Sequence, residues 1–402
     1  MPVPFNGFTV VLLVYLVLAL TYSRAQRRFV NLRRAPSPAA ASGPYHPSVD
    51  VIVPCYNEEP RLLAACLDSL RHQNYGGALN IWVVDDGSHN RAALLPVLQE
   101  AVDRGWKIEL LDRNRGKRAT QDAVVSQAKG EILLTIDSDT WIASDAVRRI
   151  VVPFRNPRVG AVTGRLRAFN AEATWLTRLL ETRYRLLFER ERAAQSYFGA
   201  VLCCAGPFAA YRREAVDRVW SRYIRPTETN RSELEPPGDD LALTNLVLAE
   251  KYDSVYEPTA EATTHVPKGV LQFLRQQRRW NRSFYRALPQ MLRLAVSRRT
   301  PYLALDLAAR TLLPALLAVA LMATTADAVL APARLPWDAA ALGGMALTSL
   351  DLGPFSHWAD RRRFLVLYGL VFVVFLLPTR LAAICTLFRN HWGTRRPPAL
   401  TH

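Results

Sequence analysis

The sequence predicts an α/β domain, with a mostly parallel sheet and helices on both faces, between apolar segments near the two ends of the chain. Between Ser48 and Ile136, short apolar runs alternate with helical patterns, and such alternation is typical of a parallel sheet. Residues 7–23 carry no charge and are long enough to span a bilayer, and further long apolar runs follow residue 300. Half of the 402 residues are hydrophobic, enough for a large core and membrane segments together.

The N-terminal apolar segment is predicted to be a membrane anchor. Arginines follow it at once, at positions 24, 27, 28, 33 and 34. By the positive-inside rule, the chain after this segment is cytosolic. A cleaved signal peptide is the alternative, but no basic region precedes the segment and no small-residue cleavage site follows it. We therefore expect residues 1–34 to form an anchor with a basic flank, and residues 35–47, rich in Pro, Ala and Ser, to form a linker.

Residues 48–267 form the predicted sheet domain, which begins with four strands. The strands are expected at residues 49–53, 81–84, 107–111 and 132–136, and the helices at 61–72, 91–104 and from Lys117 to Ala128. Ligands of such sheets bind beyond the carboxyl ends of the strands. Polar side chains collect at that edge: Tyr56, Asn57, Asp85, Asp86, Lys117, Asp137 and Asp139.

Two of these carboxylates, Asp137 and Asp139, follow a short apolar strand one residue apart. Hard oxygen ligands in this arrangement suit Mg²⁺ or Mn²⁺ that also holds substrate phosphates, although an acidic turn after a strand explains the pair alone about equally well. Several carboxylates beside a Lys, with a Tyr for stacking, favour a nucleotide diphosphate. The glycine-rich motifs of dinucleotide and P-loop sites are missing from the sequence.

The net charge limits the possible binding partners, and the cysteine content limits the redox environment in which the chain is expected to work. The formal net charge of +16 indicates nucleic acid, an anionic membrane surface or an anionic substrate as partner. No nucleic-acid-binding module is recognisable, so we expect no nucleic acid partner. The five cysteines have neither metal-ligand nor disulfide spacing, which fits a reduced, cytosolic setting for most of the chain.

Five motifs, in order along the chain, carry a family resemblance. They are Pro54-x-Tyr56-Asn57-Glu58 with Asp85-Asp86-Gly87, Lys117 and Asp137-Ser138-Asp139; the block at residues 191–213; Gly238-Asp239-Asp240 followed by Leu243-Thr244-Asn245; Gln276-Gln277-Arg278-Arg279-Trp280; and Trp392-Gly393-Thr394-Arg395. Together they resemble the membrane-embedded, processive family-2 glycosyltransferases, in particular hyaluronan synthases and nodulation-type chitin-oligosaccharide synthases. The resemblance implies a GT-A-like fold for the sheet domain.

The resemblance also implies roles for individual residues. The UDP-sugar would be bound by Pro54, Tyr56, Asn57, Glu58, Asp85, Asp86, Lys117, Asp137, Gln276, Arg279, Trp280, Trp392 and Arg395. The acceptor would be bound by Cys204, Gly206, Pro207, Tyr211, Arg212 and Trp280. A Mg²⁺ or Mn²⁺ ion would be bound by Asp139 with Asp137, and Asp240, with Asp239 beside it, would be the catalytic base. From the residues alone, a helix N-cap is the alternative for the last pair.

The C-terminal part of the chain is expected to return to the membrane. Residues 268–300, with a basic and aromatic pattern over 270–294, are predicted to be interfacial amphipathic helices. Residues 301–402 are predicted to be a membrane region with candidate spans at 303–330 and 338–358. Asp306 and Arg310, near the start of the first, could line a channel or snorkel. Residues 364–388, interrupted by Pro378 and Arg380, are interpreted as a re-entrant segment, since a full span would place Arg395 outside the cell.

Three functions are compatible with this pattern. The favoured hypothesis is a hyaluronan synthase, an inverting enzyme of the cell membrane that alternates sugars from UDP-N-acetylglucosamine and UDP-glucuronate and exports the growing polysaccharide. The alternative is a chitin-oligosaccharide synthase that uses UDP-N-acetylglucosamine alone; Gly-Asp-Asp at 238–240, where those enzymes usually carry Gly-Glu-Asp, weakens it. A non-catalytic receptor on the same scaffold is the third, and the intact metal pair and base disfavour it. The oligomeric state does not follow from the sequence.

Overall fold

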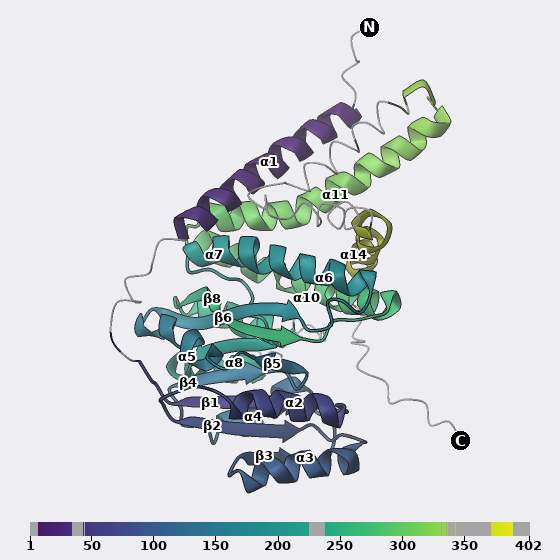
Figure 1. Ribbon diagram of the computed structural model, residues 1–402. Helices are drawn as coiled ribbons and strands as arrows, with labels where there is room; N and C mark the ends of the chain where they lie inside the picture. Colours follow the sequence, from purple (N-terminus) through teal and green to yellow (C-terminus); the bar gives the residue numbers. More distant parts are fainter. Residues whose placement is uncertain are drawn as a thin grey trace, which may run out of the picture.

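The computed structural model describes residues 7–33, 43, 45–224, 238–330, 332–334, 336, 342 and 371–388. A large sheet with its helices forms one part of the molecule, and two long helices, α1 and α11, lie together on one side of it (Figure 1). Helices α6, α7 and α10 lie between the sheet and this pair. The described residues therefore contain a long apolar helix, a sheet domain and a second long apolar helix in the predicted order.

The sheet has eight strands in the order β3-β2-β1-β4-β7-β6-β8-β5. The strands are β1 (Val49–Cys55), β2 (Leu79–Asp85), β3 (Lys107–Leu110), β4 (Ile132–Ile136), β5 (Thr140–Ile142), β6 (Val159–Ala168), β7 (Phe208–Arg212) and β8 (Asp253–Thr264). All pairs from β3 to β4 are parallel, as predicted. Beyond β4 the sheet is mixed, because β7 runs antiparallel to both β4 and β6 and β5 runs antiparallel to β8.

The reversal at β7 follows from the way the chain enters the strand. Phe208, its first residue, pairs with Ile136, the last residue of β4. The chain therefore comes into β7 from the carboxyl edge of the parallel strands, and the segment just before β7 lies at that edge. This arrangement brings the loop at residues 202–206 to the same edge as Asp137.

The three predicted helices of the sheet domain are confirmed within a few residues at their ends, as α2 (Pro60–Arg71), α3 (Arg91–Asp103) and α4 (Lys117–Val125). The sheet domain also contains α5 (Ala146–Ile150), α8 (Arg213–Ile224) and α9 (Asp239–Ala249). Helix α2 shows why they pack: its buried residues Leu63, Cys66, Leu67 and Leu70 recur at the spacing of one helix face. Strand β4 is buried along its whole length, and β1 along nearly all of it, as expected for strands covered on both faces.

A second layer of helices connects the sheet domain to the apolar helices. It contains α6 (Trp175–Leu186), a π-helical turn, η3 (Leu187–Arg192), and α7 (Ala193–Tyr197), followed later by α10 (Val270–Ser297). Helix α6 begins at a capping box made by Thr174 and Thr177. The second half of α10 buries Met291 and Leu294 with Leu241 of α9 and Leu307 of α11. This apolar cluster joins the predicted amphipathic helix to both the sheet domain and a candidate membrane helix.

In the part of the chain that the structure describes, two helices are long and apolar enough to cross a membrane: α1 (Gly7–Arg33) and α11 (Pro301–Leu330). They pack on each other through Tyr15 and Ala19 on α1 and Ala320 on α11. Apolar side chains on α1, including those of Val10, Val14 and Val17, remain exposed in the structure. These features indicate membrane association of the chain.

The remaining C-terminal elements are η6 (Phe372–Leu376) and α14 (Leu377–Cys385). The apolar helical stretch Phe372–Cys385 is shorter than a membrane span. It is connected to α10 by Arg282, which donates to the Thr386 hydroxyl, and by Arg286, which donates to the Leu387 carbonyl. The predicted span at 338–358, apart from residue 342, and the start of the predicted re-entrant segment lie outside the described residues.

Candidate active site

The carboxyl end of β2 supplies two buried aspartates that shape the surrounding loops. Asp85 accepts hydrogen bonds from the Ser88 backbone N–H and from Arg91 Nε, at 3.3 and 2.5 Å. Asp86 binds the loop before α4: it accepts from Asn114 Nδ2 (2.9 Å) and from the backbone N–H groups of Arg115 (2.7 Å) and Gly116 (2.8 Å). Burial raises the pKa of Asp86, against the effect of those two N–H groups. Asp86 thereby fixes the start of α4 and the position of Lys117.

The carboxyl end of β1 is linked to its neighbours on both sides. Pro54, still within β1, pairs in register with Val84 of β2, and Tyr56 lies edge-on to His89, with ring centroids 6.3 Å apart. Asn57 has a positive φ of 50° and accepts from the His89 backbone N–H at 2.8 Å. Glu58 is buried and accepts from the Ser138 hydroxyl at 2.8 Å. The loops after β1, β2 and β4 are thus joined by side-chain hydrogen bonds.

The carboxyl end of β4 carries Asp137 and Asp139, as predicted. Asp137 forms an ion pair with Lys117, the first residue of α4. Burial lowers the pKa of Lys117, but Asp137, with Asp240 and Asp239, outweighs it and raises the pKa above its usual value. Lys117 is therefore a permanent positive charge among the carboxylates.

The donor set at this strand end fits a divalent metal that shares its ligands with a substrate. Asp137 and Asp139 are partly exposed and follow β4 directly. Among the described residues no group of three or more His, Cys, Asp or Glu side chains could hold a metal by itself. Two carboxylates would occupy only part of the coordination sphere of Mg²⁺ or Mn²⁺, and these ions take further oxygens from phosphate and water.

The two adjacent aspartates at the start of α9 have different surroundings. Asp240 Oδ2 accepts from the Gly206 backbone N–H at 3.2 Å and from the Cys203 thiol at 3.5 Å. Asp239 Oδ1 instead accepts from Arg118 Nε at 2.7 Å. The N-cap position of α9 is occupied by Gly238, so neither aspartate is the N-cap. Only Asp240 contacts the segment before β7.

A small cavity joins these groups. It is lined by Lys117, Gln121, Thr135, Gly206, Tyr211, Asp239, Asp240 and Leu243. A Cβ at Gly206 would make a tight contact with Lys117 Nζ, at 3.0 Å, and would lie 3.8 Å from Asp240 Oδ2. The chain therefore passes closely between the cation and the candidate base, and the cavity connects Asp240 to the edge that carries Asp137.

The predicted acceptor residues around this cavity are held by α9. The Cys204 backbone N–H donates to Thr244 Oγ1 at 3.0 Å, and the Tyr211 hydroxyl shares a hydrogen bond with the same oxygen. Burial raises the pKa of Cys204 to about 12, and burial together with the charge of Asp240 raises that of Cys203. Both cysteines are therefore thiols rather than nucleophiles: Cys204 is buried, and the Cys203 thiol donates to Asp240.

Similarity to known proteins agrees with this geometry. Residues 50–220 match the model of "Glycosyl transferase family 2". An N-acetylglucosaminyltransferase of Sinorhizobium fredii is 40% identical over 392 residues, which cover 96% of this chain and 94% of that protein. The N-acetylglucosaminyltransferase of Rhizobium meliloti is 37% identical over 398 residues, covering 96% and 91%. The chain belongs to glycosyl transferase family 2.

The fold of this glycosyltransferase is shared with a more distant enzyme. A mannosyltransferase from Pyrobaculum calidifontis, solved in complex with GDP-Man and Mn²⁺, superimposes with a TM-score of 0.65 over 91% of this chain and 98% of that one. The sequence identity is 22%, so the match concerns the fold alone. It supports the predicted GT-A-like fold with a mixed sheet and long helices.

Arg212, an expected acceptor residue, lies away from the site of the glycosyltransferase. It pairs in register with Ile132, at the opposite end of β4 from Asp137. Its guanidinium donates to the backbone carbonyls of Phe154 (2.6 Å), Asn156 (3.0 Å) and Val159 (2.8 Å). Successive side chains of β7 point to opposite faces of the sheet. Tyr211 therefore lines the cavity, whereas Arg212 stabilises the turn before β6. The geometry thus gives Arg212 a structural role.

We predict that Arg212→Ala lowers stability without a selective loss of acceptor binding. Three charge-assisted hydrogen bonds would be lost, and the apparent melting temperature of the full-length enzyme in detergent should fall by about 5 °C. Arg218→Ala, which removes an exposed side chain paired with Glu214, is the matched control and should have little effect. A rise in acceptor KM with an unchanged melting temperature would instead support the acceptor role.

The remaining expected site residues lie on α10 or beyond it. Arg279 and Trp280 are exposed, Trp280 by 43%, and Gln276 is partly exposed. One helix face carries Gln276, Arg279 and Ser283, and the Ser283 hydroxyl would lie 3.4 Å from a Cβ at Gly238. This face is thus directed to the start of α9, beside Asp240. Trp392 and Arg395 lie outside the described residues.

Thr244 was named in the sequence only as part of a motif, and the structure shows that it organises Cys204 and Tyr211. Three other site residues were not singled out from the sequence: Arg118 neutralises Asp239, and Gln121 and Thr135 line the cavity. The only local signal is the position of Thr244, one helical turn after Asp240, where its hydroxyl also donates to the Asp240 carbonyl at 2.7 Å. Arg118, Gln121 and Thr135 have no such local signal, because their contacts form only when elements distant in the sequence pack together.

Proposed function

We propose that the chain is an inverting N-acetylglucosaminyltransferase that builds a chitin-type oligosaccharide from UDP-N-acetylglucosamine. The observation that carries the reaction type is the cavity that joins Asp240 to Lys117 and to the strand end with Asp137. The choice of donor is supported by relatives that share 37–40% of their residues over nearly the full chain and are named N-acetylglucosaminyltransferases.

This proposal replaces the hyaluronan synthase hypothesis. In the sequence, Gly238-Asp239-Asp240 weakened the chitin-oligosaccharide alternative and so favoured hyaluronan. The relatives that match over the whole chain are instead named for transfer of N-acetylglucosamine. The Asp at position 239 pairs with Arg118, a role that a Glu at this position could also fill, so it does not argue for the alternating polymer.

The proposed reaction forms one glycosidic bond and releases UDP. The acceptor hydroxyl oxygen attacks the anomeric carbon from the face opposite the phosphate, and the bond from that carbon to the phosphate oxygen breaks with its electron pair. Asp240 accepts the hydroxyl proton, since its carboxylate lies beside the acceptor segment at Cys203 and Gly206. Lys117 balances charge on the leaving diphosphate.

Asp137 and Asp139 are proposed to hold a divalent cation together with the diphosphate. When bound, Mg²⁺ or Mn²⁺ would neutralise charge on the leaving group. Asp85, Asp86 and Glu58 maintain the loops that surround the nucleotide, through the hydrogen bonds described above. Arg279, on the face of α10 directed to the start of α9, is proposed to contact the diphosphate, and its neighbour Trp280 to contact the acceptor sugar.

The proposed location is the cell membrane, with the sheet domain on the cytosolic side, where UDP-sugars are made. Basic residues after α1 support this orientation by the positive-inside rule. The partners are the UDP-sugar donor, the growing oligosaccharide and the lipid bilayer. The residues at 392–395 are proposed to contribute Trp392 and Arg395 to the nucleotide from the same side.

We predict that the purified enzyme makes product from UDP-N-acetylglucosamine as the only donor. Incubation with that donor and Mg²⁺ or Mn²⁺ should yield oligosaccharides that chitinase digests, because donor and acceptor sugars are then identical. Addition of UDP-glucuronate should neither lengthen the product nor make it sensitive to hyaluronan lyase. The measurement is product sizing by mass spectrometry before and after each digestion.

Two results would contradict the proposal. Product that forms only when both donors are present, and that hyaluronan lyase digests, would restore the hyaluronan hypothesis. UDP release from neither donor by folded, UDP-binding enzyme would support a non-catalytic receptor. An Asp240→Asn preparation purified in the same way controls for contaminating transferases.

A further inference from the structure

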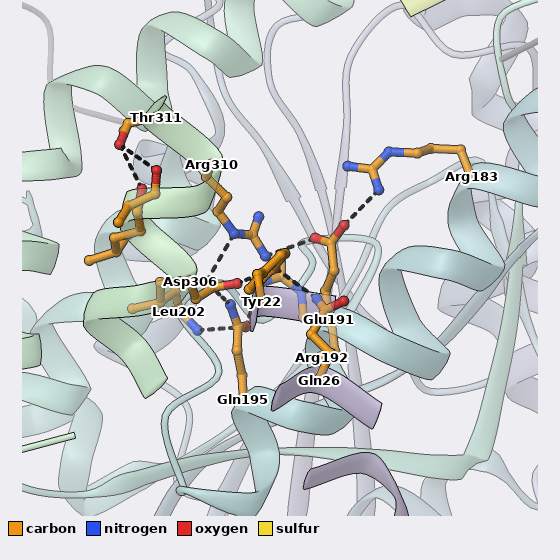
Figure 2. A network of polar contacts seen from close by, with 12 residues as sticks. Tyr22, Gln26, Arg183, Glu191, Arg192, Gln195, Leu202, Asp306, Arg310 and Thr311 are labelled. Carbon is orange, nitrogen blue, oxygen red and sulfur yellow. Dashed lines mark hydrogen bonds and ion pairs between the residues drawn. The ribbon is translucent and has the colours of Figure 1, made fainter. Parts of the chain in front are cut away.

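A buried carboxylate at the start of α11 connects three separate elements. Asp306 is fully buried (0% exposed). Its Oδ1 accepts from the Tyr22 hydroxyl of α1 at 2.6 Å, and its Oδ2 accepts from Gln195 Nε2 of α7 at 2.8 Å and from Arg310 Nε at 2.9 Å. Figure 2 shows these side chains converging on Asp306 from the different helices. A buried charge requires such partners, so each of them is held in place.

Ion pairs complete the network on the side of η3. Arg310 donates to Glu191 Oε2 and Arg183 to Glu191 Oε1, both at 2.8 Å (Figure 2). Burial would raise the pKa of Glu191, but Arg310 and Arg183 lower it to about 2, so the network is charged. Glu191 lies within the π-helical turn and Gln195 follows it in α7, and both contact side chains of α11. A π-helical turn often marks a functional site. Buried ion pairs add little to stability compared with apolar packing, but they can specify one arrangement.

Gln195 continues the network toward the active site. It is 1% exposed, and its Oε1 accepts from the Leu202 backbone N–H at 3.4 Å and from Arg192 at 3.1 Å. Leu202 begins the segment at residues 202–206, which we call the acceptor loop. The Leu202 carbonyl accepts from Asn245 of α9 at 3.2 Å. The next residues of the loop, Cys203 and Gly206, donate to the carboxylate of Asp240. A continuous series of contacts therefore runs from Asp306 to the proposed base.

We propose that Asp306 and Gln195 are positioning residues for catalysis: they hold the acceptor loop in the place where it orients Asp240 and the acceptor sugar. The position of the candidate membrane helix α11 is thereby coupled to the reactive end of the site. This inference rests on the proposed transferase function for its kinetic consequence. The position of the loop itself can be measured without any sugar.

The decisive variants first break the hydrogen bond between Gln195 and Asp306 and then restore it with donor and acceptor exchanged. Gln195→Glu places a second carboxylate against Asp306 and breaks their hydrogen bond, and we expect transfer at saturating donor to fall about tenfold. The UDP dissociation constant should stay within about twofold, because the nucleotide loops are not part of the network. In the double variant Gln195→Glu with Asp306→Asn, the new amide at position 306 can donate to the new carboxylate at position 195. This variant should recover most of the lost rate. Thr311→Val is the matched control, since its hydroxyl bonds only within α11 and the change should be neutral.

The second measurement uses Cys203 as a reporter of the loop. In a Cys385→Ser background, the exposed thiol is removed and Cys203 is the remaining cysteine that is not buried. Its labelling by a small maleimide, located by peptide mass, should be slow in the otherwise unchanged enzyme and about fivefold faster with Gln195→Glu. Tyr22→Phe, a milder change that removes one hydroxyl from Asp306, should shift both measurements in the same direction.

Three outcomes would overturn the inference. They are unchanged transfer and labelling in Gln195→Glu; no recovery in the double variant; and a fall in melting temperature and UDP affinity in proportion to the rate, which indicates a structural role only. If the parent enzyme transfers no sugar from UDP-N-acetylglucosamine, the proposed function fails. The labelling rates in Gln195→Glu and the double variant then still decide whether this network positions the loop.

Discussion

The variant Asp240→Asn is expected to lose nearly all glycosyl transfer while it retains UDP binding. A general base typically contributes about 10²–10⁴-fold to the rate, and Asn at this position cannot accept the proton from the acceptor hydroxyl. The side chain keeps its shape, and its amide oxygen can still accept from the Gly206 N–H, which now donates to Asp240 at 3.2 Å. The measurements are UDP release under saturating donor and the UDP dissociation constant by calorimetry.

Asp239→Asn is the informative comparison, because the two aspartates are neighbours with different partners. Asp239 accepts from Arg118, which also donates to the Tyr223 carbonyl at 3.0 Å and lies over the Tyr223 ring. Its replacement should lower the melting temperature and reduce turnover far less than Asp240→Asn does. If Asp239→Asn proved the more damaging to turnover at equal folding, the assignment of the base would move to Asp239. If UDP affinity fell as far as turnover in Asp240→Asn, its role would be binding rather than proton transfer.

The sequence predicted the parallel half of the sheet because its signals are local. Three of the first four strands are short apolar runs, β3 alternates polar and apolar residues, and polar residues follow each strand. The structure confirms these four strands and their parallel pairing. Asp137 and Asp139 were found in this way, since a strand end aims nearby side chains at one place. The mixed half was not predicted, because the direction of β7 depends on where the chain returns after the long stretch of helix, strand and loop from residue 137 to residue 207.

The roles of some residues depend on contacts with residues distant in the sequence, which local patterns do not show. Tyr211 and Arg212 are adjacent in one motif, yet pairing with β4 and β6 places only Tyr211 in the cavity. Gln195 and Asp306 are 111 positions apart, and no periodicity links them, so their hydrogen bond required the packing of α7 on α11. Asp306 was noticed in the sequence as a charge in an apolar segment, whereas Gln195 carried no signal of its own.

The variant Asp139→Asn is expected to abolish the metal-dependent part of UDP binding and to reduce transfer by about 10²–10³-fold. A metal on the leaving diphosphate is worth several kcal/mol of charge stabilisation, and an amide is a weaker ligand than a carboxylate. Asp139 is the better test of the pair, since Asp137 also forms the ion pair with Lys117 and its loss would disturb that cation as well. The measurement is UDP affinity with and without Mg²⁺ or Mn²⁺, together with transfer under saturating donor.

Asp145→Asn serves as the matched control for Asp139→Asn. It changes a nearby carboxylate at the start of α5 that pairs with Arg149 on the same helix, at 2.6 Å, and it should leave both measurements unchanged. Because the metal would bind Asp139 and the diphosphate together, wild-type enzyme should bind UDP more tightly with metal than without, and Asp139→Asn should bind it equally in both conditions. Substantial oligosaccharide synthesis by Asp139→Asn, or a metal effect on UDP binding that survives the change, would place the cation elsewhere. A wild-type enzyme whose UDP affinity and transfer rate are both insensitive to chelator would remove the metal from the proposed reaction and leave Lys117 as the cation that neutralises the leaving group.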